Sequence, residues 1–439
     1  MLKNKSELRS RDLYLNKLIA FQDTEPVKII TGIRRCGKSS LLKLMAQHLL
    51  DSGIMEEQII ELNFESMKFR RMDVEALYQY VNELLPDGKR AYLFLDEIQR
   101  VDKWQDAVNS FRVDFDCDIY VTGSNAYLLS SEYATYLAGR SIEIKMLPLS
   151  FCEFIDFHGY TVEERISPSG RINKYIYDAN GEGYEPKELL EAYLMFGGMP
   201  GIADIGLDTD KALTLLDGVY STVVVRDILE REKRRGQRQI TDPDLLRKII
   251  MFLADNIGNI TSITSITNKL IHEKLLDSNR NGNPSVHTIQ AYVGALLESY
   301  VFYEIKRFDI KGKEYLRTLG KYYITDIGLR NYLLGFRDMD IGHIIENIVY
   351  FELLRRGYDV AIGKIGDKEV DFIATSAGEK KYIQVTESLN DSGTRERELA
   401  PLRTIRDNYE KMVIASNIDF PITQDGINII KLTDFLMNS

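Results

Sequence analysis

Residues 32–39 read Gly-Ile-Arg-Arg-Cys-Gly-Lys-Ser, a segment that matches the phosphate-loop pattern G-x-x-x-x-G-K-[ST] in full. It follows an apolar run over Val27–Thr31 and precedes a helical pattern over Ser39–Leu50, which is the strand–loop–helix context that the pattern requires. In such a loop successive backbone N–H groups point at an anion, and the helix N-terminus adds positive potential. The sequence therefore predicts a site for the phosphates of ATP, formed by Gly32, Ile33, Arg34, Arg35, Cys36, Gly37, Lys38, Ser39 and Ser40.

Two acidic residues after a later apolar strand complete this predicted site. The run Tyr92–Leu95 is followed directly by Asp96 and Glu97. In phosphate-loop enzymes an acid at this place holds Mg²⁺, and a second carboxylate orients the attacking water. We therefore expect Asp96 and the hydroxyl of Ser39 to bind Mg²⁺, and we expect Glu97 to orient the water. Lys38 would pair with the β- and γ-phosphate oxygens.

A third strand, expected over Asp118–Val121, ends in the polar segment Thr122-Gly123-Ser124-Asn125. Polar side chains there would lie between the other two strand ends. Ser124 or Asn125 would then hydrogen-bond the γ-phosphate or the attacking water. The same segment also suits a turn followed by a helix N-cap, and the spacing leaves both interpretations open.

Short apolar runs alternate with helical patterns from Val27 to about Met146. Strands are expected over 27–31, 59–64, 92–95, 119–121 and 142–146, and helices over 39–50, 73–85 and 104–112. Strand and helix in alternation imply a parallel sheet with helices on both faces. We therefore predict an α/β domain over residues 1–150.

Composition sets limits on the class of protein. The chain has 439 residues and a net charge of −10, so it has room for about three domains. Its acidic balance argues against a protein that coats nucleic acid through bulk charge, and three cysteines exclude a disulfide-rich scaffold. No apolar run approaches the ~18 residues of a transmembrane helix, and the N-terminus has no apolar signal core. We expect a cytoplasmic protein with no membrane partner.

Three further regions follow the predicted α/β domain. Residues 151–240 are expected to be mostly helical, with a polar insert over 167–184. Residues 241–338 combine helices with a hairpin around Lys311-Gly312-Lys313, an order typical of a winged helix, and we call this hairpin the wing. Residues 339–439 return to a strand and helix pattern, which predicts a second, smaller α/β domain.

Several segments together resemble a prokaryotic branch of the AAA+ superfamily. In chain order they are GIRRCGKSS, LFLDEIQRV, YVTGSNAYLL, LAGR, LPLSFCEF, FGGMPG and VVRDIL. In that branch the ATPase is joined to a C-terminal region of unknown function, the DUF4143 type. The resemblance implies a Mg²⁺-dependent AAA+ ATPase core with a parallel sheet, a helical lid, a winged helix and a small nuclease-like α/β domain.

The resemblance also assigns roles to particular residues. It places the Walker A motif at Gly32, Gly37, Lys38 and Ser39. It places Walker B at Asp96 and Glu97, and sensor 1 at Ser124 or Asn125. Arg140, in LAGR, would contact the γ-phosphate in the same or a neighbouring subunit and stabilise the transition state. A surface ion pair is the alternative for Arg140. Pro200, in FGGMPG, would line the adenine pocket or belong to a tight turn.

Two groups of basic residues are candidates for contacts with DNA phosphates. The first comprises Arg231, Lys233, Arg234, Arg235 and Arg238. The second, in the wing, comprises Lys306, Arg307, Lys311, Lys313, Arg317 and Lys321. The candidate recognition helix, Ser285–Tyr300, has no lysine or arginine, which argues against base-specific recognition. A solvated charged face or a protein-docking surface is the alternative.

The last domain resembles a PD-(D/E)xK nuclease arrangement at Glu346, Asp371 and Gln384-Val385-Thr386. A working site needs acidic oxygens on Mg²⁺ and a lysine near the attacking water. Gln384 and Thr386 stand where the second acid and the lysine would be. We therefore expect a degenerate fold that binds nucleic acid or a protein and does not cut.

Our leading functional hypothesis is an ATP-hydrolysing switch or motor, in which the nucleotide state moves the winged helix and the C-terminal domain. One alternative is a slow, ATP-gated module that holds DNA or a protein. Another is an ATP-regulated nuclease that uses Glu346 and Asp371. An oligomer is compatible with the sequence, which does not name the partner.

Overall fold

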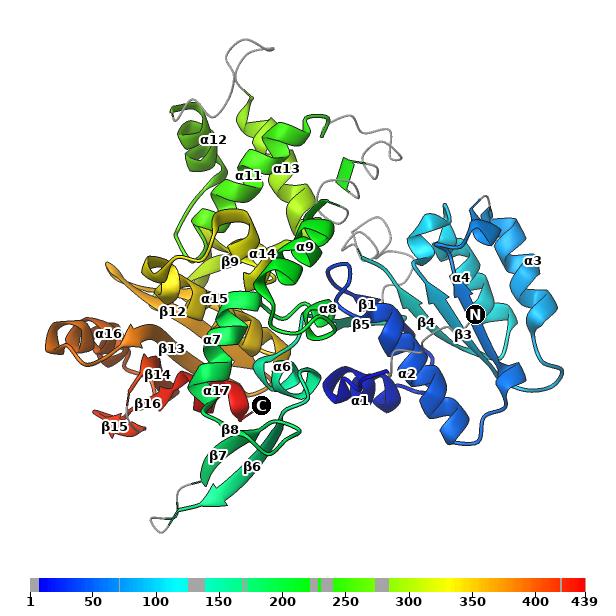
Figure 1. Cartoon of the computed structure of the whole chain (residues 1–439). Helices are drawn as coiled ribbons and strands as arrows, with labels where there is room; N and C mark the ends of the chain where they lie inside the picture. Colours follow the sequence, from blue (N-terminus) through cyan, green and yellow to red (C-terminus); the bar gives the residue numbers. More distant parts are fainter. Residues whose placement is uncertain are drawn as a thin grey trace. The chain divides into compact units, whose positions relative to one another are not determined.

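The computed structural model describes residues 8–70, 72–124, 139–167, 170, 172–221, 228–229, 240–272, 284–418 and 421–438. The chain divides into two compact units. The first comprises residues 1–147 with 298–300, and the second comprises residues 148–297 with 301–439. Figure 1 shows the first unit mainly in blue and cyan, and the second from green to red.

The first unit contains a five-stranded parallel sheet, as the alternating pattern predicted. Its strands are β1 (Val27–Thr31), β2 (Ile59–Asn63), β3 (Ala91–Asp96), β4 (Cys117–Thr122) and β5 (Ser141–Lys145). Their order across the sheet is β2-β3-β4-β1-β5. Strand β4 therefore lies between the strand that precedes the phosphate loop and the strand that ends in Asp96. The C-terminal ends of all five strands meet at one edge, which is where open α/β sheets bind ligands.

Helices cover both faces of this sheet (Figure 1). They are α1 (Asp12–Ala20), α2 (Lys38–Asp51), α3 (Val74–Leu84) and α4 (Trp104–Asp114). Side chains that alternate along the strands, such as Ile29, Leu93 and Val121, pack with Leu77 of α3 and Phe111 of α4 in one buried cluster. This packing holds the strand ends, and therefore the predicted site, on a rigid support.

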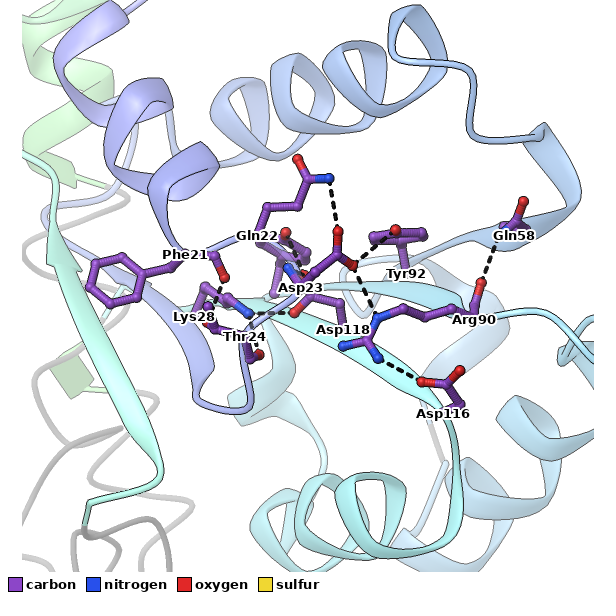
Figure 2. Close-up of polar contacts among 11 residues, drawn as sticks. Phe21, Gln22, Asp23, Thr24, Lys28, Gln58, Arg90, Tyr92, Asp116 and Asp118 are labelled. Carbon is purple, nitrogen blue, oxygen red and sulfur yellow. Dashed lines mark hydrogen bonds and ion pairs between the residues drawn. The ribbon is translucent and has the colours of Figure 1, made fainter.

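A buried ion pair lies at the other edge of the sheet, near the N-terminal ends of β1 and β4 (Figure 2). The Lys28 ammonium group donates to Asp118 Oδ1 at 2.5 Å and to the carbonyl oxygen of Thr24 at 2.9 Å. Asp118 Oδ2 accepts hydrogen bonds from the backbone N–H of Asp23 and the hydroxyl of Tyr120, each at 2.8 Å. Because these partners satisfy both charges, the pair ties the turn before β1 to the sheet.

The second unit begins with helices and a small sheet. The helices are α6 (Phe151–Phe157), α7 (Pro186–Phe196), α8 (Pro200–Ala203), α9 (Thr209–Val219), α11 (Pro243–Asp255), α12 (Ile263–His272) and α13 (Val286–Glu298). The predicted polar insert belongs to a three-stranded antiparallel sheet of β6 (Thr161–Ile166), β7 (Ile172–Tyr177) and β8 (Gly183–Tyr184). β-Branched and aromatic residues, such as Val162 in β6 and Ile176 and Tyr177 in β7, favour strands in this segment.

An eight-stranded mixed sheet forms the C-terminal part of the second unit, with the order β10-β9-β11-β12-β13-β14-β16-β15. Its strands are β9 (Phe302–Asp309), β10 (Glu314–Ile324), β11 (Asp359–Ile365), β12 (Lys368–Ser376), β13 (Glu379–Ser388), β14 (Glu410–Asn417), β15 (Ile422–Gln424) and β16 (Ile427–Lys431). The accompanying helices are α14 (Ile327–Leu334), α15 (Ile341–Arg355), α16 (Ser392–Thr404) and α17 (Leu432–Met437). Strand β9 pairs in parallel with β11, so this sheet crosses the domain boundary predicted between residues 338 and 339.

Candidate functional site

The phosphate loop connects β1 to α2 at the C-terminal edge of the parallel sheet. Gly32 and Gly37 have φ values of 137° and 105°, a backbone region that favours glycine. A Cβ atom on Gly32 would lie 2.1 Å from the carbonyl oxygen of Met146, so no side chain fits there. Both glycines of the pattern are therefore required by the backbone, and α2 begins immediately after the loop at Lys38.

Lys38 lies over this loop and is buried. Its ammonium group donates to the carbonyl oxygens of Gly32 at 2.9 Å and Ile33 at 3.0 Å. A lysine has three N–H donors, so the group can also meet an anion at the loop. Of the neighbouring residues, Ile33 and Cys36 are buried, whereas Arg35, Ser39 and Ser40 are exposed.

Asp96 connects three strand ends and the first turn of α2. Its Oδ1 accepts hydrogen bonds from Ser39 Oγ at 3.1 Å and from Thr122 Oγ1 at 2.6 Å. Its Oδ2 accepts one from Asn63 Nδ2 at 2.9 Å. Carboxylate and hydroxyl oxygens are ligands that Mg²⁺ prefers, so Asp96 and Ser39 fit the metal that a phosphate-loop site implies.

Glu97 follows Asp96 in an uncommon backbone conformation. Its φ of 56° lies in the left-handed region, which costs a non-glycine residue energy and is frequent at functional sites. Its Oε2 accepts hydrogen bonds from Gln99 Nε2 at 2.5 Å and from Ser124 Oγ at 3.4 Å. Its backbone N–H donates to Thr122 Oγ1 at 3.0 Å. The structure thus brings Glu97 and Ser124 together, and Asn125 lies outside the described residues.

The segment after β2 links the phosphate loop to Asp96. Arg34 of the loop and Arg100 both form ion pairs with Glu65, and the Arg100 pair measures 3.0 Å. The backbone N–H of Glu65 donates to Asn63 Oδ1 at 2.8 Å, and the side-chain amide of Asn63 reaches Asp96. Arg34 therefore has an acidic partner within the site.

Sequence analysis did not assign roles to Asn63, Gln99 or the hydroxyl of Thr122. Thr122 was visible as a polar residue at a strand end, but its contact with Asp96 depends on β4 lying between β1 and β3. Asn63 ends β2 opposite Asp96 in the register of the sheet. Thr122 could have been found as a polar residue directly after its predicted strand, whereas Asn63 lay inside the predicted strand 59–64 and gave no such signal.

Arg140 lies at the edge of the sheet away from the phosphate loop. Its carbonyl oxygen accepts a hydrogen bond from the backbone N–H of Val27 at 2.9 Å, at the start of β1. The five residues of β1, at about 3.3 Å each, place the loop roughly 16 Å away. This distance contradicts a contact between Arg140 and a γ-phosphate of the same subunit, and leaves the neighbouring subunit or a surface ion pair as the alternatives.

Pro200 is the first residue of α8 in the second unit, and the segment before it forms a tight joint with Asp326. Asp326 Oδ2 accepts a hydrogen bond from the N–H of Gly198 at 2.7 Å, and Oδ1 accepts one from Leu329 at 2.9 Å. Burial raises the pKa of the Asp326 carboxyl to about 6, against the opposing effect of these N–H groups. A Cβ atom on Gly197 would lie 2.5 Å from Asp326 Oδ1, and one on Gly198 would lie 2.5 Å from the carbonyl oxygen of Leu149, which explains these two glycines of FGGMPG. The adenine-lining role of Pro200 stays a prediction.

The two basic groups differ in what the structure describes. Arg231, Lys233, Arg234, Arg235 and Arg238 lie outside the described residues, and so does the side chain of Arg317. Lys306, Lys311 and Lys313 are exposed on the β9–β10 hairpin, and Arg307 is half-buried. Lys321 is buried, with 3% of its surface exposed. The prediction that Lys321 contacts DNA phosphates as part of the wing is therefore wrong.

Lys321 instead enters the acidic cluster of the predicted nuclease-like domain. Its ammonium nitrogen lies 2.7 Å from Glu346 Oε1 and 2.8 Å from Glu369 Oε1. The sequence prediction gave this cluster no lysine, because Thr386 on β13 stands at the position where the nuclease pattern has one. In the part of the chain that the structure describes, no three His, Cys, Asp or Glu residues are arranged to hold a metal ion.

Comparison with known families identifies two regions of the chain. Residues 24–155 match a family described as an AAA domain, which spans the parallel sheet and the phosphate loop. Residues 187–340 match a domain of unknown function, DUF8612. The DUF4143-type region that the resemblance implied is not confirmed.

Two relatives align over almost the whole chain, and both are described as uncharacterized proteins. The Haemophilus influenzae protein is 39% identical over 430 residues, which cover 98% of each chain. The Methanocaldococcus jannaschii protein is 31% identical over 423 residues, covering 94% of this chain and 84% of the relative. Among solved structures, a Walker-type ATPase of Pyrococcus abyssi is 16% identical with a TM-score of 0.45, and the match covers 74% of this chain and 95% of that one. Within the described residues, no helix is both long and apolar enough to cross a membrane.

Proposed function

The chain belongs to the family of these two uncharacterized relatives and carries an AAA domain over residues 24–155, and from this premise we propose that it hydrolyses ATP at residues 32–39. The nucleotide state would act as a switch or motor for the second unit. The observation that carries the proposal is the convergence of Ser39, Thr122 and Asn63 on the Asp96 carboxylate at 2.6–3.1 Å.

The loop would bind the triphosphate through charge and backbone donors. Inward-pointing N–H groups and the N-terminus of α2 favour an anion. Lys38 would exchange its bonds to the Gly32 and Ile33 carbonyl oxygens for bonds to phosphate oxygens, because a charged acceptor makes the stronger hydrogen bond. Arg34, Arg35, Cys36, Gly37 and Ser40 would complete the loop around the phosphates.

Ser39 and Asp96 would hold Mg²⁺, which supplies positive charge to the phosphate oxygens when it is bound. Thr122 and Asn63 keep the Asp96 carboxylate in one orientation before the metal arrives. Such preorganisation avoids rearrangement during the reaction. Asp96 is 7% exposed, so water competes little for its oxygens.

Glu97 would accept the proton of the attacking water or orient it. Gln99 and Ser124 hold its carboxylate, and the left-handed backbone aims the side chain differently from that of Asp96. Ser124 would be the sensor that hydrogen-bonds the γ-phosphate or the water, together with Asn125. Arg140 would act on the site of a neighbouring subunit, and Pro200 would contact adenine.

Steady-state hydrolysis and ATP binding by the full chain test this proposal. Lys38→Ala should abolish ATP binding, whereas Lys43→Ala, an exposed lysine on the same helix, should leave it unchanged. Glu97→Gln should bind ATP normally and lose about a hundredfold or more in turnover. Glu61→Gln, which changes an exposed glutamate on β2, is its control. Unchanged ATP affinity of Lys38→Ala would contradict the proposed site.

The second candidate is an ATP-gated module that binds DNA and turns over very slowly. It is favoured by the three exposed lysines of the hairpin, Lys306, Lys311 and Lys313, which could contact phosphates. ATP binding with no measurable turnover would support this candidate. DNA affinity should then fall as salt is raised, and it should weaken in Lys311→Ala/Lys313→Ala. ATP hydrolysis that is indifferent to DNA would instead indicate a protein partner.

A further inference from the structure

Lys321 is the electrostatic centre of the acidic cluster in the C-terminal sheet. It lies on β10, and its ammonium nitrogen is 2.7 Å from Glu346 Oε1 on α15. The same nitrogen is 2.8 Å from Glu369 Oε1 and 3.9 Å from Asp371 Oδ1, both on β12. The Lys321 side chain is only 4% exposed, so these carboxylates take the place of solvent around its charge.

The carboxylate oxygens around Lys321 have further partners. Glu346 Oε1 also accepts the hydroxyl of Tyr323 at 2.5 Å, and Asp371 Oδ2 accepts the backbone N–H of Val385 at 2.8 Å. Burial lowers the pKa of Lys321, but Glu346, Asp371 and Glu369 outweigh that effect, so the pKa lies above its ordinary value. The lysine therefore stays charged.

Gln384 is turned away from the centre of the cluster. Its Oε1 accepts the backbone N–H of Asp371 at 2.8 Å, and its Nε2 donates to Glu398 Oε2 at 2.9 Å. Both ends of this amide are used within the protein. Gln384 therefore holds β12, β13 and α16 together and does not replace a carboxylate at the centre.

A nuclease-like site at Glu346 and Asp371 implies a divalent cation on these carboxylates. The residues present do not fit such a cation, because the ammonium group of Lys321 already contacts the oxygens that would bind it. A second positive charge within a few ångströms would be strongly repelled in this buried setting. Lys321 alone makes the cluster unsuitable for a divalent cation, since the carboxylates are of the type that such a cation requires.

We propose that Lys321 is the permanent cation of this cluster and stands in for the divalent metal of a nuclease-like site. Its single positive charge offsets part of the negative charge of Glu346 and Glu369, and its contacts with them fasten the edge strand β10 to α15 and β12. The cluster is accordingly a structural joint between the β9–β10 hairpin and the rest of the sheet. It takes up no divalent metal while Lys321 is in place.

Mn²⁺ binding, measured by electron paramagnetic resonance on the full chain without nucleotide, tests this proposal. All samples carry Asp96→Asn, which removes the metal position of the phosphate loop. In the chain that retains Lys321, Asp371→Asn should leave Mn²⁺ binding unchanged, because the cluster holds no ion that it could lose. Lys321→Met should gain about one Mn²⁺ per chain, and adding Asp371→Asn should abolish that gain.

Thermal unfolding supplies a second readout with a matched control. Lys321→Met should lower the Tm, and Mn²⁺ should restore part of it, whereas Lys306→Met on the same hairpin should leave the Tm unchanged. Lys321→Arg keeps the charge and should gain no Mn²⁺ site. If Lys321→Met does not fold, the comparison of the Lys321 chain with its Asp371→Asn variant still tests whether the cluster takes up a metal ion while Lys321 is present.

Two results would overturn the proposal. One is Mn²⁺ bound by the chain that retains Lys321 and lost on Asp371→Asn, because the cluster would then be a metal site with a lysine beside it. The other is a folded Lys321→Met protein that binds no Mn²⁺, because Lys321 would then not be what excludes the metal.

Discussion

The hydroxyl of Thr122 donates a hydrogen bond to Asp96 Oδ1 at 2.6 Å and accepts one from the backbone N–H of Glu97 at 3.0 Å. One side chain thus orients both acids of the proposed site. Thr122 reaches them because β4 lies beside β3 in the sheet. The methyl group of Thr122 takes no part in these hydrogen bonds. A substitution can therefore remove the hydroxyl and keep the volume of the side chain.

Thr122→Val should therefore slow ATP hydrolysis while leaving the fold intact. The change keeps the shape of the side chain but removes a hydrogen bond to a carboxylate, worth about 1.5–3 kcal/mol. We expect kcat to fall by roughly 10- to 100-fold and ATP affinity to stay nearly constant. Thr122→Ser, which retains the hydroxyl, is the control. Hydrolysis by Thr122→Val at the rate of the unmodified chain would refute this role.

Asp118→Asn should destabilise the first unit, because it leaves the buried ammonium group of Lys28 beside a neutral amide. Loss of one partner of a buried pair costs about 3–5 kcal/mol. Trp104 is the single tryptophan and is buried in the core of this unit, so its fluorescence in a urea titration reports the unfolding. Asp116→Asn, which alters the exposed partner of Arg90, should change the free energy of unfolding by about 0.5 kcal/mol or less.

The Lys28 ion pair also predicts a pH dependence. Burial lowers the pKa of Lys28, and the hydrogen bond and charge of Asp118 oppose this effect. Because the folded state holds the Lys28 proton less tightly than the unfolded state, keeping Lys28 charged lowers the free energy of unfolding. This cost is full at low pH and disappears as the pH rises through the ordinary lysine range. The deficit of Asp118→Asn should therefore shrink as the pH is raised towards 10.5. A deficit that grows with pH would contradict this account.

Asp326 should make the second unit less stable as the pH rises. Burial raises its pKa from 3.8 to about 6, so the folded state holds the proton more tightly than the unfolded state. Its contribution is therefore complete below about pH 3.8 and is lost as the pH passes 6. Relative to Asp326→Asn, the free energy of unfolding should fall by about 2 kcal/mol between about pH 4.5 and about pH 7.

Circular dichroism in urea measures this difference, and Trp104 fluorescence identifies the transition of the first unit. The unmodified chain and the Asp326→Asn variant must be compared at each pH, because other carboxylates also titrate in this range. Parallel pH profiles of these two proteins would show that the carboxyl is not the source. A profile of the opposite sign would mean that the N–H donors around Asp326 outweigh its burial.

Gly328→Ala should destabilise the joint between α14 and the C-terminal end of α7. A Cβ atom on Gly328 would lie 2.0 Å from the carbonyl oxygen of Phe196, which is backbone and has little freedom to move. Overpacking of this kind costs about 1–3 kcal/mol, which should appear as a lower Tm. Gly342→Ala is the control, since a Cβ atom there would meet nothing within 4 Å. Equal Tm values for the two variants would contradict the predicted clash.

The phosphate loop and the acid pair were predictable because their chemistry depends on short spacings. Gly32 to Ser39 is a local pattern, and Asp96 and Glu97 follow a strand that its apolar run identifies. The strands of the parallel sheet were predicted for the same reason, whereas β9 and β10 of the eight-stranded sheet were assigned to the wing of a separate domain. Arg140 shows the limit of such patterns. Its motif, LAGR, did not indicate whether it would lie at the N-terminal or the C-terminal ends of the strands.

Lys321 shows a second limit. A lysine in a hairpin is usually solvated, so its local sequence favoured an exposed position. Its burial depends on β9 pairing with β11, which brings β10 close to carboxylates that follow Lys321 by 25 to 50 residues. No spacing rule connects residues that meet through strand pairing of this kind.

Local patterns were thus enough to predict the loop, the acids and the alternation of strands and helices, since turn chemistry and side-chain periodicity act over a few residues. Strand order was a matter of long-range packing. The order of the strands brings Thr122 and Asn63 into contact with Asp96. It also leaves Arg140 far from the phosphate loop and Lys321 buried. These contacts join residues far apart in the chain, and they form because apolar faces and backbone hydrogen bonds must be satisfied by the whole sheet.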